Sequence, residues 1–294
     1  DNAAKIAKKA SKNNTKFRIS VVEGREVISS CIVGDFGWHG TYSIDEGDGC
    51  IMYAEYPSNK STDKNKFSSK ILRSTDGGFS WSSVFEIGYP EIRHFHTCTA
   101  IPNREGNWIV TSGDTPSQSR FWISEDDGEN WREVSEVDPI PGYSSLTQRK
   151  SVHRTVVMGF QDGGLIWATD DILGEPSKYG EGEGEVSSKL VKSVYPGDTV
   201  VSEIVCSLGM HTRSMIDVGI AWVFISEAKY LEKVGGPEVF VVFKEAPEES
   251  YSILEIENKR ARPTGGTYSK SSISSTNGIF FTDMGDGLFS NEYR

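Results

Sequence analysis

The feature that most constrains this chain is an internal repeat with a period of about 57 residues, long enough to hold one supersecondary unit. Four of the five histidines are His39, His96, His153 and His211, which follow one another at intervals of 57, 57 and 58 in the numbering. A further step of 57 reaches Tyr268. A fixed period of this length indicates one unit that is duplicated along the chain, and 294 residues hold five such units.

Two chemically different markers keep the same period. Acidic residues end strongly β-prone runs at Glu55, Asp114, Asp170, Glu227 and Asp283. Turn glycines recur at Gly49, Gly106, Gly163, Gly219 and Gly278. Because three series stay in phase, the repeat is not a coincidence of one residue type.

The residue pattern within each repeat predicts short β-strands. Runs of β-branched and aromatic residues, such as 50–56, 107–113 and 220–226, are bounded by Gly, Asp and Asn turn signals. We expect the marker His (or Tyr268) to open a first strand, a glycine turn to follow, and a second strand to end at the acid. Two less regular strands complete the unit. Four antiparallel strands repeated radially predict an all-β fold, a five-bladed β-propeller with about 57 residues per blade.

The two ends of the chain bear on how the propeller closes. Residues 284–294 are too few for two outer strands, whereas two strand candidates, 16–24 and 26–33, precede the first repeat. We expect these N-terminal strands to complete the last blade and remove its free edge, with Phe17–Glu23 beside the final residues. An open sandwich is the alternative. The predicted organisation is an N-terminal arm over residues 1–15 and a single propeller domain over residues 16–294.

Two hairpin corners share one motif. Residues 74–81 and 124–131 both read Ser-x-Asp-x-Gly-x-x-Trp. In such a corner the Asp accepts backbone N–H groups, the Gly adopts a positive φ and the Trp covers the hairpin stem. On this motif the chain resembles the sialidase-like β-propeller superfamily, which carries the Asp-box, or bacterial neuraminidase repeat. The resemblance implies the fold and no particular activity, since both enzymes and non-enzymes carry the box.

The chain is not similar to true sialidases in other respects. Residues 17–20 read Phe-Arg-Ile-Ser, where the sialidase motif ends in proline, and we expect Arg18 to be structural. Sialidases usually have six blades, and this sequence indicates five.

The strand order places the repeated markers on one face. Within each repeat the start of the first strand lies beside the end of the antiparallel second strand, so His and acid markers should crowd the axis. The predicted catalytic residues are His96, His153, His211, Tyr268, Asp114 and Asp170. The predicted substrate-binding residues are Trp38, His94, Arg93, Arg154, Arg213, Lys270, Glu55, Glu227 and Asp283.

Three interpretations of this axial site compete. In the first, imidazoles from separate blades hold one divalent metal; the candidate ligands are His39, His96, His153 and His211. In the second, the His residues and Tyr268 act as acid and base on a sugar by β-elimination, or two carboxylates hydrolyse a glycosidic bond. In elimination, Arg213 and Lys270 would neutralise a uronate carboxylate. In the third, each His and its acid form a repeated structural pair.

Composition narrows the possible partners. The net charge of −11 argues against nucleic acid and anionic membranes, and no run of 18 apolar residues occurs. The local cations favour an anionic glycan. We therefore expect a secreted or extracellular carbohydrate-active enzyme, a glycan hydrolase or polysaccharide lyase, possessing an axial funnel. The alternative is a non-enzymatic glycan-binding or structural propeller, such as an adhesin or virion component.

Overall fold

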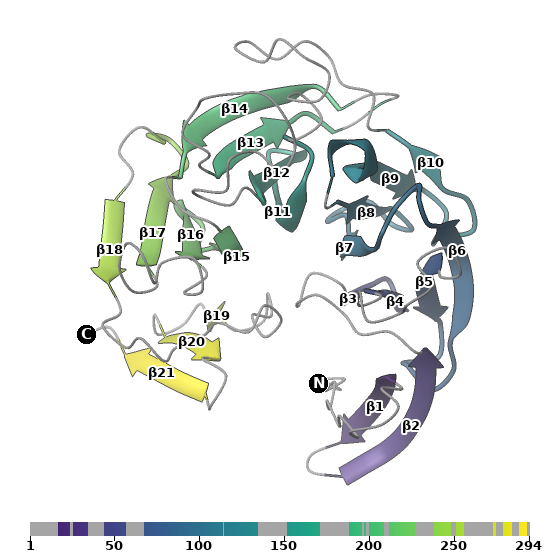
Figure 1. Cartoon of the computed structure of the whole chain (residues 1–294). Coiled ribbons are helices and arrows are strands. Elements are labelled where there is room, and N and C mark those ends of the chain that lie inside the picture. Colours follow the sequence, from purple (N-terminus) through teal and green to yellow (C-terminus); the bar gives the residue numbers. More distant parts are fainter. Residues whose placement is uncertain are drawn as a thin grey trace. The chain divides into compact units, whose positions relative to one another are not determined.

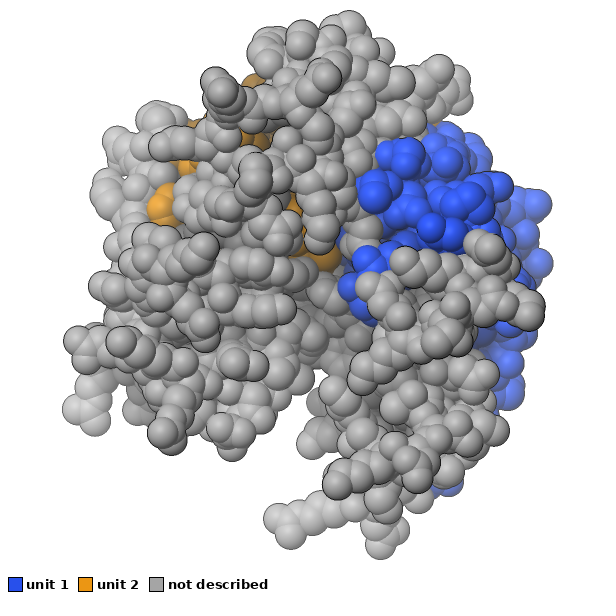
Figure 2. All heavy atoms as spheres, viewed as in Figure 1, with its two compact units in different colours: residues 1–39, 43–134 blue, residues 40–42, 135–294 orange. Residues whose placement is uncertain are grey.

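The protein is represented by a computed structural model, and its chain divides into two compact units (Figure 2). The first comprises residues 1–39 and 43–134, and the second comprises residues 40–42 and 135–294. The structure describes residues 17–23, 26–34, 44–56, 68–113, 115–134, 152–170, 188–195, 197, 200–208, 212–226, 238–247, 251–255, 273–274, 279–283 and 288–292. The predicted single domain over residues 16–294 stays a prediction.

The first unit contains a hairpin and two four-stranded antiparallel sheets whose strands follow chain order (Figure 1). The hairpin pairs β1 (Phe17–Glu23) with β2 (Glu26–Gly34). One sheet consists of β3 (Ile44–Gly47), β4 (Cys50–Ala54), β5 (Ser68–Ser74) and β6 (Ser82–Gly88). The other consists of β7 (Phe95–Ala100), β8 (Trp108–Ser112), β9 (Phe121–Ser124) and β10 (Arg132–Glu133), with a 3₁₀ turn at Pro116–Gln118.

The second unit repeats this pattern. One four-stranded sheet consists of β11 (Thr155–Gln161), β12 (Gly164–Thr169), β13 (Lys189–Ser193) and β14 (Ser202–Ser207). The next consists of β15 (Thr212–Asp217), β16 (Ala221–Ser226), β17 (Glu238–Phe243) and β18 (Tyr251–Glu255). A three-stranded sheet consists of β19 (Ile273–Ser274), β20 (Ile279–Asp283) and β21 (Leu288–Glu292).

The strand starts carry the repeat that the sequence predicts. The second strands β4, β8, β12, β16 and β20 begin at residues 50, 108, 164, 221 and 279, so successive starts differ by 58, 56, 57 and 58 in the numbering. The chain is therefore all-β and built of antiparallel sheets with the strand order of propeller blades. In the described part of the chain, β1 pairs with β2 and β21 with β20. The number of blades and the closure of the ring stay predictions.

The marker glycines form the turns expected of them. Asp48–Gly49 and Asp162–Gly163 are two-residue hairpin loops in which all four residues have positive φ, between 50° and 80°. This is the geometry of a type I′ turn, which matches the twist of the flanking strands. Gly106 and Gly219 also have positive φ, whereas Gly278 lies outside the described residues.

The two Ser-x-Asp-x-Gly-x-x-Trp corners have matching hydrogen bonds. In the first, Asp76 accepts the N–H and the hydroxyl of Ser80, and the indole of Trp81 donates to the carbonyl of Gly78 at 3.0 Å. In the second, Asp126 accepts both the backbone and side-chain N–H groups of Asn130. The corners thus form as the motif predicts, between β5 and β6 and between β9 and β10.

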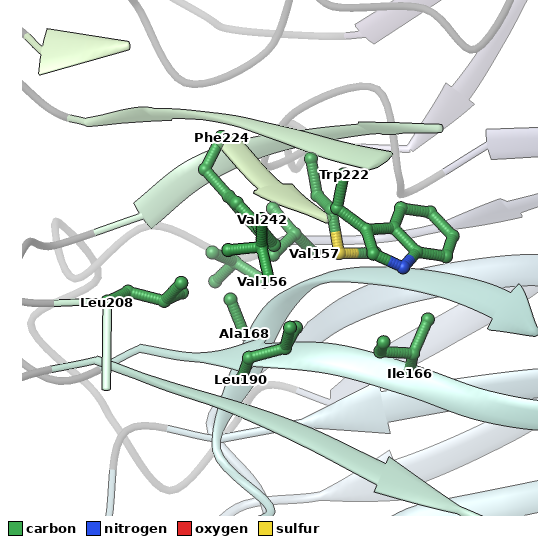
Figure 3. Close-up of a cluster of buried hydrophobic side chains, with 10 residues drawn as sticks. Val156, Val157, Ile166, Ala168, Leu190, Leu208, Trp222, Phe224 and Val242 are labelled. Carbon is green, nitrogen blue, oxygen red and sulfur yellow. The ribbon is translucent and has the colours of Figure 1, made fainter. Parts of the chain in front are cut away.

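Apolar side chains fill the space between neighbouring sheets in each unit. In the first unit, side chains of the β3–β6 sheet meet Phe95, Cys98 and Trp108 of the β7–β10 sheet. In the second, Figure 3 shows the side chains of Ala168 and Leu190 facing Trp222 and Phe224 of the next sheet. Trp108 and Trp222, both in second strands, thus lie in the core between neighbouring sheets. Among the described residues no helix is long and apolar enough to cross a membrane.

Candidate functional site

The start of each first strand lies beside the end of the second strand. Phe95 pairs with Ser112 across β7 and β8, and Thr155 pairs with Thr169 across β11 and β12. The juxtaposition predicted from antiparallel pairing is thus present in each of these sheets. It brings the residues that precede and open the first strand together with those that follow the second.

A β-bulge shapes the start of the first strand. The pairing of β7 with β8 shifts between Phe95 and Thr97, which leaves His96 as the extra residue. A bulge redirects side chains and interrupts the alternation of faces. Cys98 accordingly lies in the same apolar cluster as Phe95. The first strands β11 and β15 carry the same shift, at Val156 and at Arg213.

His94 and His96 form a buried imidazole pair at this strand start. Their Nε2 atoms are 3.1 Å apart, and the ring centroids are separated by 5.0 Å. The side chains are 0% and 2% exposed. For this hydrogen bond to form, one Nε2 donates a proton and the other accepts it, so the two nitrogens share one proton.

Tyr56 holds this pair from the neighbouring sheet. It follows β4, and its ring stacks on His94 with the centroids 3.7 Å apart and the planes at 24°. Glu55, which precedes Tyr56, is buried, and its backbone N–H continues the ladder with the carbonyl of Lys70. The hydroxyl of Ser69 donates to the carbonyl of Arg93 at 3.2 Å and holds the backbone of the segment that leads into β7. The end of one sheet and the start of the next therefore meet at the imidazole pair.

The charge of the buried Glu55 contributes to a raised pKa of the nearby Tyr53. Burial, and secondarily the charge of Glu55, raises the pKa of Tyr53, which lies two residues before Glu55 along the chain. Because the phenol of Tyr53 is 2% exposed, it stays protonated at neutral pH. Tyr53 is thus a neutral core residue, whereas the half-buried Tyr56 is the tyrosine that contacts the imidazole pair.

In the second unit a cation and an acid meet at the equivalent strand ends. Arg154 precedes β11 and Asp170 follows β12, and their Nη2 and Oδ2 atoms are 2.9 Å apart. Both side chains are nearly buried, and the N–H of Asp170 also donates to the carbonyl of Arg154. The marker acid Asp170 and the neighbouring cation Arg154 thus form a buried ion pair, which neutralises both charges.

His153 makes a different contact from that of His96. Its Nε2 lies 3.1 Å from the hydroxyl of Ser202 in β14, the outermost strand of its sheet. Its ring also meets Trp167 edge-on at 6.1 Å, and the indole of Trp167 donates to the carbonyl of Val152. These contacts anchor the segment that leads into β11 against its own sheet.

The equal spacing of His96 and His153 does not make them equivalent. By strand pairing, His96 corresponds to Val156 and to Arg213, because these residues occupy the bulge of their first strands. The difference arises in the connection between first and second strands. Seven residues, 101–107, join β7 to β8, whereas two residues, 162–163, join β11 to β12.

The remaining predicted site residues have no described side chains. Arg213 lies in β15 and Asp283 in β20, and their side chains are outside the described set. Outside the described residues altogether are Trp38, His39, Asp114, His211, Glu227, Tyr268 and Lys270. Their roles stay predictions. Among the described residues no three His, Cys, Asp or Glu side chains gather as metal ligands do, so the four-histidine metal site also stays a prediction.

Two contacts were not anticipated from the sequence. Tyr56 directly follows the marker Glu55, and an aromatic residue beside a marker acid is the signal that could have identified it. Ser202 opens an outer strand that carries no marker, and nothing in the sequence distinguishes it.

No protein-family model matches the sequence, and no curated protein matches it. The backbone is similar to that of an oligogalacturonate lyase in complex with manganese, with a TM-score of 0.48 and 8% identity. The match covers 82% of this chain and 61% of that one, so this chain spans less than two thirds of the lyase.

Two glycoside hydrolases show similar values. The family 93 α-L-arabinofuranosidase of Fusarium graminearum, in complex with arabinobiose, has a TM-score of 0.47 and 12% identity over 88% of this chain and 77% of that one. A family 117 glycoside hydrolase of Zobellia galactanivorans has a TM-score of 0.45 and 13% identity over 84% and 81%. These similarities are ones of backbone arrangement alone.

Proposed function

We propose that this chain is a carbohydrate-active enzyme that cleaves an anionic glycan by β-elimination, in the manner of a polysaccharide lyase. The observation that carries the proposal is the buried hydrogen bond between the Nε2 atoms of His94 and His96, under the ring of Tyr56. The pair stands at a strand start, next to the half-buried Arg93.

Elimination from a uronate needs one base, one acid and one cation. The base removes the proton beside the carboxylate, and the electron pair of that C–H bond forms a carbon–carbon double bond within the ring. The bond to the leaving sugar oxygen breaks, and its electron pair goes to that oxygen. The leaving oxygen takes up a proton. Two imidazoles that share one proton supply both a proton acceptor and a proton donor in one place.

Arg93 has the chemistry required of the cation. A guanidinium beside the uronate carboxylate would stabilise the negative charge that develops when the proton leaves. The hydroxyl of Ser69 donates to the carbonyl of Arg93, which holds the backbone from which the Arg93 side chain extends. Arg213 and Lys270, which the sequence predicts for the same task in the axial site, remain part of the proposal.

Hydrolysis is the competing reaction, and it requires two carboxylates on opposite sides of the glycosidic bond. Glu55 is the buried carboxylate that adjoins Tyr56. The predicted catalytic carboxylates, Asp114 and Asp170, are the residues on which a hydrolase mechanism would depend. Product analysis separates the two reactions, since elimination gives unsaturated uronates and hydrolysis does not.

The test is a screen of the purified chain on uronate-containing and neutral polysaccharides. Release of reducing ends and absorbance of unsaturated uronates are followed together. We expect elimination products from an anionic glycan, and a loss of roughly 10²–10⁴-fold in turnover for His94→Gln and for His96→Gln. The control is Ser80→Ala in the first hairpin corner, which we expect to retain full turnover.

Three results would count against the proposal. If both histidine variants turn over like the wild type, the imidazole pair is not catalytic. Reducing ends without unsaturated products indicate a hydrolase. Glycan binding without any turnover by the wild type indicates the binding module that is the alternative from sequence.

A further inference from the structure

The imidazole pair has a geometry that a shared proton does not require. His94 directly precedes β7 and His96 lies within it, and their Nε2 atoms are 3.1 Å apart. The ring planes are inclined at 35° and the centroids are 5.0 Å apart. A collinear arrangement of the two rings would separate the centroids further, so the rings converge at an angle.

Converging imidazole nitrogens at this separation fit around one metal ion. Two atoms 3.1 Å apart can each lie about 2.1 Å from a common point, with an angle of roughly 95° at that point. This angle lies between the right angle of octahedral coordination and the wider tetrahedral angle. We propose that His94 and His96 together chelate a first-row divalent cation that favours imidazole, such as Zn²⁺ or Co²⁺.

The surroundings hold both rings in this orientation. The bulge at His96 fixes its backbone relative to β8, and the stacked ring of Tyr56 fixes the plane of His94. Both side chains are buried, so few other rotamers are open to them. Metal ligands that are already oriented lose less entropy on binding.

Metal binding changes where the shared proton is held. In the metal-free pair, one ring carries its proton on Nε2 and donates it to the other. For both Nε2 atoms to act as ligands, this proton moves to Nδ1 of the same ring. Two imidazoles would occupy two neighbouring positions of the ion and leave its remaining positions to other ligands.

This site differs from the one that the sequence predicts. The predicted ligands come from four different repeats and include His39, His153 and His211, whereas the chelate uses two histidines at the start of one strand. His94 was assigned to substrate and not to metal. The metal site rests on geometry alone; its role in glycan cleavage rests on the function proposed above.

The test is isothermal titration calorimetry of Zn²⁺ into the full chain after treatment with a chelator. We expect one ion per chain, and a loss of affinity of at least roughly 10–100-fold for His94→Gln and for His96→Gln. His153→Gln is the discriminating variant, because its imidazole bonds to Ser202 in the second unit. Equal weakening by His153→Gln would support the four-histidine site and overturn the chelate.

A second measurement protects the test against misfolded variants. Binding of Co²⁺ to the wild-type chain is followed by its visible absorption spectrum, and Zn²⁺ should raise the melting temperature of the wild type. No Co²⁺ spectrum and no Zn²⁺ binding by the wild type would overturn the site. Turnover without metal binding would overturn the metal site and leave the proposed function intact. Metal binding without turnover would overturn the proposed function and leave the metal site intact.

Discussion

At the scale of single residues, the corners that follow β5 and β9 show how one carboxylate organises a turn. Asp76 accepts three hydrogen bonds, from the hydroxyl of Ser74 and from the hydroxyl and N–H of Ser80. These bonds, those from Ser80 foremost, lower the pKa of Asp76 from 3.8 to about 2. The side-chain and backbone N–H groups of Asn130 similarly help to lower the pKa of Asp126.

This lowered pKa predicts a pH-dependent contribution to stability. Because the folded-state pKa of Asp76 is below the unfolded value, its contribution is fully present above pH 3.8 and is lost as the pH falls towards about 2. We expect Asp76→Asn to lower the melting temperature at neutral pH, and the difference from the wild type to shrink below pH 3.8. Thermal unfolding across this range measures it. A difference that is independent of pH would show that the carboxylate charge is not what stabilises the corner.

Gly164 is a position where packing excludes any side chain. A Cβ atom there would overlap the carbonyl oxygen of Ser193 in the neighbouring strand, whereas a Cβ at Gly88 would meet nothing within 4 Å. The obstacle at Gly164 is backbone, which can move only by disturbing the pairing of β12 with β13. We therefore expect Gly164→Ala to cost about 1–3 kcal/mol of unfolding free energy in urea.

Gly88→Ala is the matched control, because it changes the same atoms where there is space. It should leave stability unchanged or raise it by up to about 1 kcal/mol, since alanine restricts the unfolded chain. Equal effects of the two substitutions would refute the steric explanation.

At the scale of elements, the positions of second strands and turns could be predicted from the sequence, and the register of first strands could not. The glycine turns are local: Asp48–Gly49 and Asp162–Gly163 specify their own conformation, so their period survives in the structure. The histidine period does not have this basis. His96 lies in a bulge and His153 precedes its strand, because the two first-to-second connections differ in length.

In the candidate site, too, one part of the arrangement could be predicted from the sequence and another part could not. That strand start and strand end would meet was predictable, since antiparallel pairing requires it, and Arg154 with Asp170 shows the result. Which side chains would touch depended on the bulge and on packing between sheets. Neither the stacking of Tyr56 on His94 nor the bond of His153 to Ser202 has a signature in residue spacing.

At the scale of the whole molecule, the sheets of each unit pack through their faces. What the strands at the two ends of the chain pair with stays a prediction. The hairpin of β1 and β2 has two strands, and the sheet of β19–β21 has three. Each is shorter by at least one strand than the four-stranded sheets between them. Strands left with an open edge are prone to pair with other chains, which favours their pairing with each other.

Hydrogen exchange on the full chain tests this predicted closure. If β1 or β2 extends the sheet of β19–β21, amides of residues 288–292 gain protection from a partner strand. Val21→Pro removes a donor from β1 and disturbs its pairing, and it should then increase exchange in residues 288–292 as well as in β2. Lys8→Pro, in the predicted arm, should change neither. Faster exchange in β2 with unchanged exchange in residues 288–292 would mean that the chain ends do not pair, and the open arrangement would replace the closed ring.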